Sequence, residues 1–313
     1  MNDLEKSIIK TALYYEALGQ YPLTAVEIYR YLQKENDVQT MPSFSQFWPE
    51  INRVNALESH NGFFFTKGNR SFYGQRISRQ KIAIAKWHKI RRVAVYLGLT
   101  PFLRGLVVSG SLAFSNTKKK SDIDLLVFTK KGRIWTCRTL LSLLLQLIGQ
   151  RRHGQIIENK ICLNHYIAEG HFAVSLENLS NAQLYSHLIP LTDFQNFVIF
   201  QSQNAWMTKF LFGHPHAKEH YLRRINENTM LFAISCILAK IIEWLLSDFL
   251  GNALEKALAK WQRKRIEQKT YLGQPAENQL YLSEHALLFH YPVSKNNEVM
   301  SAYFNKLRTF PFL

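Results

Sequence analysis

Two aspartates stand alone in a long basic stretch of the sequence. Between Ser59 and Ile157 there are nineteen Lys or Arg residues and only two acids, Asp122 and Asp124. Both lie in the apolar run Ser-Asp-Ile-Asp-Leu-Leu-Val-Phe, residues 121–128, which is typical of a strand. Residues two apart on a strand point to the same face, so the two carboxylates project side by side. Such a pair suits Mg²⁺, which prefers oxygen ligands and binds one or two carboxylates together with substrate phosphates.

The segment before this pair predicts phosphate binding. Residues 106–108 form a short apolar run that ends at Gly110 and Ser111. A glycine lets the backbone approach a ligand closely, and exposed N–H groups beside a hydroxyl can hold phosphate oxygens. We therefore expect Gly110 and Ser111 to contact a nucleotide.

The combined pattern resembles the signature of the nucleotidyltransferase superfamily, which includes polymerase-β-like enzymes and small bacterial nucleotidyltransferases. A short apolar strand runs into Gly-Ser, and after a spacer of ten residues Asp-apolar-Asp-apolar follows, so the match covers residues 107–113 and 121–127. The whole chain further resembles an uncharacterised group of bacterial nucleotidyltransferase-domain proteins, for which the resemblance implies a fold and a domain order but no substrate. The segments that carry this second resemblance are residues 21–24, 108–113, 121–124, 132–135, 161–164, 189–191 and 261–262.

The resemblance implies that Asp122 and Asp124 hold two Mg²⁺ ions and that the substrate is a nucleoside triphosphate. One ion would neutralise the triphosphate, and the other, shared with a third carboxylate on a neighbouring strand, would activate a hydroxyl for in-line attack on the α-phosphorus. Gly110 and Ser111 would bind the β- and γ-phosphates. The implied reaction moves a nucleoside monophosphate from the triphosphate to an unknown hydroxyl acceptor and releases pyrophosphate.

The sequence departs from this pattern on the third strand. Residues 161–167 contain no acid, and Asn164 or His165 stands where the third carboxylate is expected. Asn164 is the candidate for the third position, but it offers an oxygen without charge, which would weaken the metal that activates the nucleophile. Other acids that would replace the missing carboxylate are Glu158, Glu169 and Asp193.

Length and composition set the broad class of the protein. With 313 residues, 47% of them hydrophobic, the chain can form two or three domains with real cores. The net charge of +16 predicts an anionic partner: the nucleoside triphosphate, a nucleic acid or another anionic acceptor, or acidic lipid head groups. Three cysteines without paired spacing argue against a disulfide framework, and the N-terminus has no secretion-signal pattern, so we expect a cytoplasmic protein. The sequence does not indicate an oligomeric state.

Residues 1–75 predict a winged-helix-like module. Helical patterns cover residues 4–18, 24–32 and 43–57, and a hairpin of residues 62–66 and 71–73 would turn at residues 67–70. A winged helix suggests DNA binding, but the third helix offers Arg53 and little else that is basic. A docking or protein-contact role is therefore preferred over duplex recognition.

The pattern of residues 76–178 predicts an α/β domain with a mixed sheet, for which the resemblance implies the nucleotidyltransferase fold, behind a basic amphipathic lead-in helix over residues 77–97. Its strands are expected at residues 106–108, 123–128 and 160–167, with a helix at 133–148. Residues 179–313 predict a helical C-terminal region that walls the cleft. Within it, Met230–Leu250 is long enough to cross a bilayer, but three charges would each cost about 2.5–3.5 kcal/mol at mid-membrane. A buried helix and no membrane span are therefore predicted.

Weaker candidates complete the set. For the loop Lys118–Lys120 two roles are open: contact with phosphates, or a solvated loop tip. For Arg133 and Arg138 the alternatives are contact with the triphosphate and a position on the surface. A zinc site at His214, His216 and His220 lacks a fourth ligand. Two alternatives to the transferase stay open: a catalytically impaired nucleotide- or nucleic-acid-binding protein of the same fold, and a winged-helix DNA-binding regulator.

Overall fold

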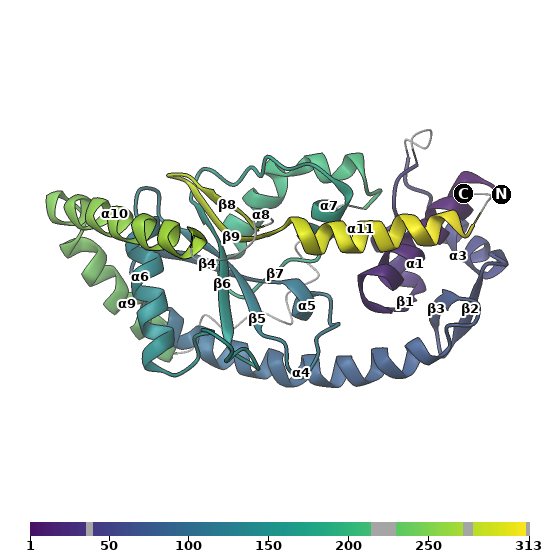
Figure 1. Ribbon diagram of the computed structural model, residues 1–313, viewed down its shortest axis with the longest axis horizontal. Helices are drawn as coiled ribbons and strands as arrows, with labels where there is room; N and C mark the ends of the chain where they lie inside the picture. Colours follow the sequence, from purple (N-terminus) through teal and green to yellow (C-terminus); the bar gives the residue numbers. More distant parts are fainter. Residues whose placement is uncertain (36–39, 214–229, 272–277, 311–313) are drawn as a thin grey trace.

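Within residues 1–35, 40–213, 230–271 and 278–310, which the structure describes, the computed structural model has a six-stranded mixed sheet and a three-stranded antiparallel one (Figure 1). The long helix α4 (Ser71–Leu97) runs along one side of the molecule and connects the parts that contain these two sheets. The predicted mixed α/β class is confirmed.

Side-chain caps define the helices of the N-terminal part. Thr24 and Glu27 form the predicted capping box at the start of the second helix, and Ser43 and Gln46 form another at the start of the third. The third helix ends before the predicted Leu57, because Leu57 begins a strand. The elements are α1 (Asp3–Gly19), β1 (Leu23–Thr24), α2 (Ala25–Arg30), α3 (Phe44–Arg53), β2 (Leu57–His60) and β3 (Phe63–Thr66).

The hairpin lies earlier in the chain than the sequence analysis predicts. Strands β2 and β3 are joined by Asn61 and Gly62, whose φ angles are 50° and 79°. Two successive positive φ angles are typical of the type I′ hairpin turn, for which Asn-Gly is a favoured pair. The prediction that residues 71–73 form the second strand is wrong, since they begin α4.

The central sheet confirms the three predicted strands and extends them. They are β4 (Leu103–Ser109), β5 (Ile123–Thr129) and β6 (Ile161–Ala168). Strand β5 pairs antiparallel with β4 and parallel with β6. The short helix α5 (Gly110–Ala113) follows β4 directly, and α6 (Ile134–Leu147) covers the predicted helix at 133–148.

Alternate residues of β5 face two different cores. Ile123, Leu125 and Val127 belong to a cluster with residues of α4 and α6. Leu126 and Phe128 belong to a cluster on the other side of the sheet with residues of α7 (Leu179–Ser186) and α8 (Phe194–Gln203). The period of two therefore assigns Asp122 and Asp124 to the α7/α8 side.

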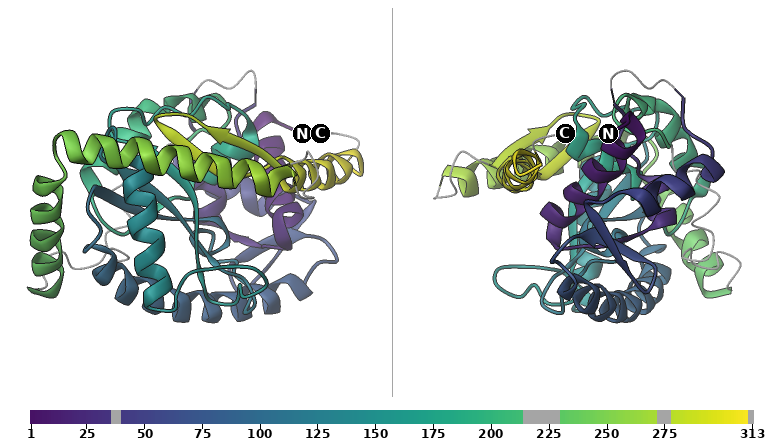
Figure 2. Two further views of the ribbon diagram at one scale, coloured as in Figure 1. Left: turned by 60° about the vertical axis from the view of Figure 1, so that its left-hand side comes forward. Right: turned by 90° about the vertical axis from the view of Figure 1, so that its right-hand side faces the viewer.

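The C-terminal region is helical only in part. Besides α7 and α8 it contains β7 (Ile189–Pro190), a 3-10 turn η1 (Ala205–Lys209), α9 (Met230–Leu245), α10 (Phe249–Tyr271), β8 (Asn278–Leu282), β9 (Ala286–Pro292) and α11 (Val293–Arg308). Strand β7 pairs with β4 and β9 pairs with β6, so this region completes both edges of the central sheet. Helix α11 packs against α1, so the last helix of the chain lies beside the first (Figures 1 and 2).

The prediction that Met230–Leu250 is a buried helix is wrong. Helix α9 contacts α4 at Ser235, whose hydroxyl donates to the carbonyl of Val95, while Trp244 is 75% exposed and most other apolar side chains of the helix are exposed as well. In the described residues no single helix has both the length and the apolarity to cross a membrane. Helix α9 and residues Phe249–Gln268 pass that test only as a pair, bent by 96°.

Candidate functional site

Both aspartates lie at the start of β5 on one face of the sheet. Asp122 directly precedes the strand, and Asp124 is its second residue, opposite Ser109 of β4 and Cys162 of β6. The intervening Ile123 is fully buried in the core on the opposite side. The predicted side-by-side projection of the two carboxylates is therefore present in the structure.

Cys162 joins this pair. One ligand atom from each of Asp122, Asp124 and Cys162 lies within 4.8 Å of the others, a spacing that allows a shared metal ion. Two carboxylates suit a hard cation such as Mg²⁺, whereas a thiolate suits a softer one such as Zn²⁺. Burial, followed by the charge of Asp124, raises the pKa of the Cys162 thiol to about 12. The thiol therefore stays protonated near pH 7, and the two carboxylates are the ready ligands.

Arg152 pairs with Asp122. Its Nη1 lies 2.5 Å from Asp122 Oδ2, and the side chain of Asp122 is only 16% exposed. Partial burial by itself lowers the pKa of Arg152, but Cys162 and Asp122 outweigh this effect and raise the pKa. Arg152 is positioned by the edge of β6, because its backbone N–H donates to the carbonyl of Ile161. A metal ion at the carboxylates would therefore share Asp122 with a guanidinium.

Asn164 is held by two hydrogen bonds. Its Nδ2 donates to Asp124 Oδ1 at 2.6 Å, and its Oδ1 accepts from the thiol of Cys162 at 2.6 Å. The side chain therefore presents its amide N–H group to the carboxylate and turns its oxygen toward the thiol. The amide oxygen of Asn164, the predicted third position, therefore faces the thiol of Cys162 and not the carboxylate of Asp124.

His165, the other residue considered for the third position, lies one row further along the sheet. It is paired in register with Leu126, and its ring centroid is 6.3 Å from that of Tyr185. Burial lowers the pKa of His165 to about 3, so the ring is neutral near pH 7.

Gly110 packs directly against Asp124. It has a φ of 61°, and a Cβ at this position would lie 2.5 Å from Asp124 Oδ2. Both the left-handed conformation and the close approach require glycine. Ser111 follows in α5 and is partly exposed. The predicted nucleotide-binding pair thus lies beside the carboxylates.

Lys86 of α4 fixes the loop that leads into the site. Its side chain is 2% exposed, and its Nζ donates to the carbonyl oxygens of Lys118 and Ser121 and to the hydroxyls of Thr117 and Ser121. Burial lowers the pKa of Lys86, and the nearby charges of Asp122, Glu158 and Asp124 partly oppose this effect. Because Ser121 directly precedes Asp122, these hydrogen bonds fix the backbone from which the first carboxylate projects.

The weaker candidates lie elsewhere. Arg133 is buried and donates to the backbone carbonyls of Leu246 and Ser247, and Arg138 donates to Gln262 Oε1. These two arginines therefore brace the C-terminal helices, and neither faces the carboxylate pair. The loop Lys118–Lys120 is exposed, and the proposed zinc ligands at 214, 216 and 220 lie outside the described residues.

The acids considered as replacements for the third carboxylate also have other positions. Glu169 lies 3.7 Å from Arg104, and the side chain of Asp193 accepts from the backbone N–H of Asn196 at the start of α8. Glu158 is exposed in the loop before β6. Among the described residues, none of the three belongs to the group formed by Asp122, Asp124 and Cys162.

Sequence reasoning missed Arg152, Cys162 and Lys86. Cys162 was detectable, because it lies two residues before Asn164 and a period of two gives both the same face. Arg152 lies in irregular backbone after α6, where no periodicity indicates its direction. Lys86 carries no signal that distinguishes it from the other cations of α4.

The site therefore combines a carboxylate pair, a thiol, an arginine counter-charge and a tight glycine turn. Such a combination can bind a divalent cation, and the arginine and the turn supply donors for an anionic ligand beside it. No protein-family model, no curated protein and no solved structure matches the chain.

Proposed function

We propose that this protein is a nucleotidyltransferase that moves a nucleoside monophosphate from a nucleoside triphosphate to a hydroxyl acceptor, with a divalent cation, most simply Mg²⁺, held by Asp122 and Asp124. The observation that carries the proposal is the convergence of these carboxylates with the Gly110 turn. The carboxylates lie together, and Gly110 approaches one of them so closely that a Cβ on it would lie 2.5 Å from Asp124 Oδ2. A triphosphate at this turn would therefore lie next to the metal ligands.

Each residue has a separate part in the proposed reaction. Asp122 and Asp124 hold the cation, which when bound neutralises phosphate charge and lowers the pKa of the attacking hydroxyl. The backbone N–H groups at Gly110 and Ser111 orient the distal phosphates. Arg152, which forms the ion pair with Asp122, offers a planar donor to a phosphate oxygen as well.

A second candidate function is nucleotide binding without transfer. It is favoured by the third strand, where Asn164 donates its amide to Asp124 and no carboxylate is present. Asp122 is also already neutralised by Arg152. Under this alternative the site binds a metal–nucleotide complex and the hydroxyl is never activated.

The decisive experiment incubates the protein with α-³²P-labelled nucleoside triphosphates, Mg²⁺ and a cell extract, and follows label transfer and pyrophosphate release. Wild type is compared with Asp122→Asn, Asp124→Asn and the control Asp248→Asn, an exposed carboxylate of the turn between α9 and α10. Transfer by wild type and the control, but by neither site variant, supports the transferase. Nucleotide binding in calorimetry without pyrophosphate release supports the second candidate, and failure to bind any nucleotide refutes both.

The N-terminal part is proposed to be a winged-helix-like docking module. It has the helices and the hairpin that such a module requires. The exposed surface of α3 carries the large apolar side chains Phe44 and Trp48, with exposures of 39% and 50%, and ends at Arg53. An apolar surface with little positive charge favours contact with protein over contact with duplex DNA. Binding to duplex DNA that survives Asp122→Asn would overturn this assignment.

A further inference from the structure

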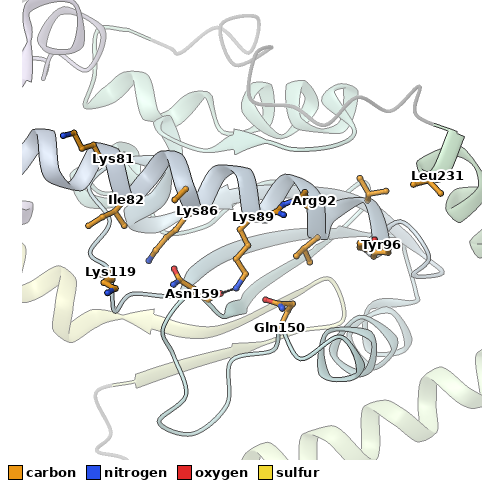
Figure 3. A pocket seen from close by; sticks show the side chains of 13 residues that line it. Lys81, Ile82, Lys86, Lys89, Arg92, Tyr96, Lys119, Gln150, Asn159 and Leu231 are labelled. Carbon is orange, nitrogen blue, oxygen red and sulfur yellow. Dashed lines mark hydrogen bonds between the residues drawn. The ribbon is translucent and has the colours of Figure 1, made fainter.

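A cationic groove of about 1040 Å³ runs along α4 (Figure 3). Its charged lining residues are Lys81, Lys86, Lys89, Arg92 and Lys119, and none of the described residues that line it is acidic. Lys119 lies across the groove from the helix, together with Asn159 and Gln150 (Figure 3). The groove is therefore a concave surface of one charge sign, which attracts anions more strongly than scattered surface cations do.

The cations of the helix form a row. Lys81, Lys89 and Arg92 follow one another at intervals of eight and three residues, and Tyr96 continues the same side four residues later. From Lys81 to Tyr96 the helix rises by about 22 Å at 1.5 Å per residue. A single triphosphate needs cations that converge on one point, whereas a row of this length matches up to about six phosphates at a stacked spacing of about 3.4 Å.

The end of the groove favours a single strand over a duplex. Tyr96 is 56% exposed, and Val93 and Leu231 line the groove near it. An exposed aromatic ring beside apolar side chains offers a surface on which an unpaired base stacks, which a base inside a duplex cannot do. A cationic groove combined with an aromatic platform is the usual arrangement for single-stranded nucleic acid.

Hydrogen bonds connect the groove to the start of the carboxylate site. The Nζ of Lys86 and the backbone N–H of Asn159 both donate to the carbonyl of Ser121, the residue directly before Asp122. Lys89 also donates to the carbonyl of Asn159, so Ser121 and Asn159 are attached to α4 through Lys86 and Lys89. Two residues that line the groove, Lys86 and Asn159, are therefore hydrogen-bonded to the residue that precedes the first carboxylate.

From this geometry we infer that the groove along α4 binds single-stranded nucleic acid, and that the strand supplies the terminal hydroxyl that accepts the nucleotide. The acceptor role rests on the proposed transferase function, whereas binding in the groove does not. The phosphates of the nucleic acid lie along Lys81, Lys89 and Arg92, and one base stacks on Tyr96. The end of the nucleic acid passes Ser121 toward Asp122.

Binding is tested by fluorescence anisotropy with a labelled 12-nucleotide RNA of mixed sequence. The same sequence as a duplex, and vesicles of phosphatidylcholine with phosphatidylglycerol, are measured beside it. The groove variants are Lys81→Glu/Arg92→Glu and Tyr96→Ala, all at exposed positions. The matched control is Lys260→Glu/Lys264→Glu, with the same change of charge at exposed positions of α10, far from α4 in Figures 1 and 2.

We expect the wild type to bind the single strand more tightly than the duplex or the vesicles. The double groove variant should lose at least about 10-fold in affinity. The slope of the logarithm of the binding constant against the logarithm of the salt concentration should become shallower by about 1.4, because two phosphate contacts each contribute about 0.7. Tyr96→Ala should weaken binding by about 5- to 100-fold, the range of one stacked base. The inference is overturned by equal losses in the α10 control, or by tighter binding of the duplex or of vesicles.

Two further outcomes separate this inference from the proposed function. Asp124→Asn should bind the RNA as wild type does. If wild type binds the RNA through the groove but transfers no label to it or to any component of the extract, the transferase proposal fails and groove binding stands, without the acceptor role. If label transfer proceeds equally in wild type and in Lys81→Glu/Arg92→Glu, the acceptor role of the groove-bound strand fails and the transferase stands.

Discussion

Replacing Arg152 with Gln should strengthen divalent-cation binding at the carboxylate pair. The guanidinium lies 2.5 Å from Asp122 Oδ2, on the carboxylate that a cation must share. Glutamine keeps a hydrogen-bond donor of similar reach but removes the positive charge. The variant therefore isolates the electrostatic competition between Arg152 and a bound metal ion.

The size of the effect follows from the geometry. A cation bound to Asp122 Oδ2 at a metal–oxygen distance of about 2.1 Å would lie at most about 4.6 Å from Arg152 Nη1, which is 2.5 Å from the same oxygen. At that separation a charge of +1 and a charge of +2 repel by about 2 kcal/mol in the dielectric constant of bulk water and by about 7 kcal/mol at an effective value of 20. Because Arg152 is 33% exposed, we take the lower figure, which corresponds to about 20-fold in affinity.

The measurement is isothermal titration calorimetry with Mn²⁺, and with Mg²⁺ as a second cation, on the folded protein. Arg151→Gln is the matched control, because it removes the same charge from the neighbouring exposed residue. Its effect should stay below about 2-fold, since solvent screens charges that are farther from the site. Asp122→Asn should abolish binding in either arginine background.

Two results would refute this reasoning. Equal affinity in wild type and Arg152→Gln would show that the guanidinium does not compete with the cation. A gain in Arg151→Gln as large as that in Arg152→Gln would show that only the net charge of the region matters, and the specific ion pair would have no role.

Three further perturbations test the surroundings of the site. Gly110→Ala should lower the free energy of unfolding by about 1–3 kcal/mol and weaken metal binding, because of its positive φ and its contact with Asp124; chemical denaturation and calorimetry check this. Lys86→Met should lower the same free energy by about 1–3 kcal/mol, since buried carbonyl groups lose their donor, and the α4 control Lys81→Met should not. Burial raises the pKa of Glu243, but hydrogen bonds, chiefly from Arg104, outweigh it and hold the pKa below 4.5, so the stability from this group is present above pH 4.5 and is lost as the pH falls through the lowered pKa. Glu243→Gln should therefore flatten the acid limb of a plot of stability against pH, and an unchanged limb would contradict this assignment.

The sequence predicted the strand that carries the acids because its signals are local. The alternation of Asp122, Ile123, Asp124 and Leu125 fixes which side chains face the core, and the structure confirms that choice. The glycine turn before it is equally local, since Gly110 has the positive φ that glycine permits. Signals of this kind depend only on residues next to one another in the chain.

The parts that the sequence missed depend on residues far apart in the chain. Strand β9 pairs with β6, which lies more than a hundred residues earlier in the sequence. The apolar run of β9 does not indicate that partner. Arg152 reaches Asp122 because the backbone before β6 folds back along the strand. The predicted hairpin turn at residues 67–70 is wrong for a different reason, because the turn signal at Asn61 and Gly62 is equally local and is the stronger of the two.

The hydrogen bonds around the two aspartates offset the repulsion between their carboxylates. Carboxylates within 4.8 Å of each other repel by about 1–3 kcal/mol for effective dielectric constants between 80 and 20, and Arg152 and Asn164 offset that repulsion by donating to one aspartate each. The backbone of Arg152 is held separately, through its N–H bond to Ile161. Its side chain can therefore exchange Asp122 for a phosphate oxygen while the strand edge stays in place. Under the proposed function, a divalent cation at Asp122 and a triphosphate oxygen at Arg152 would together neutralise both side chains, whereas either ligand alone would leave one of them without a counter-charge.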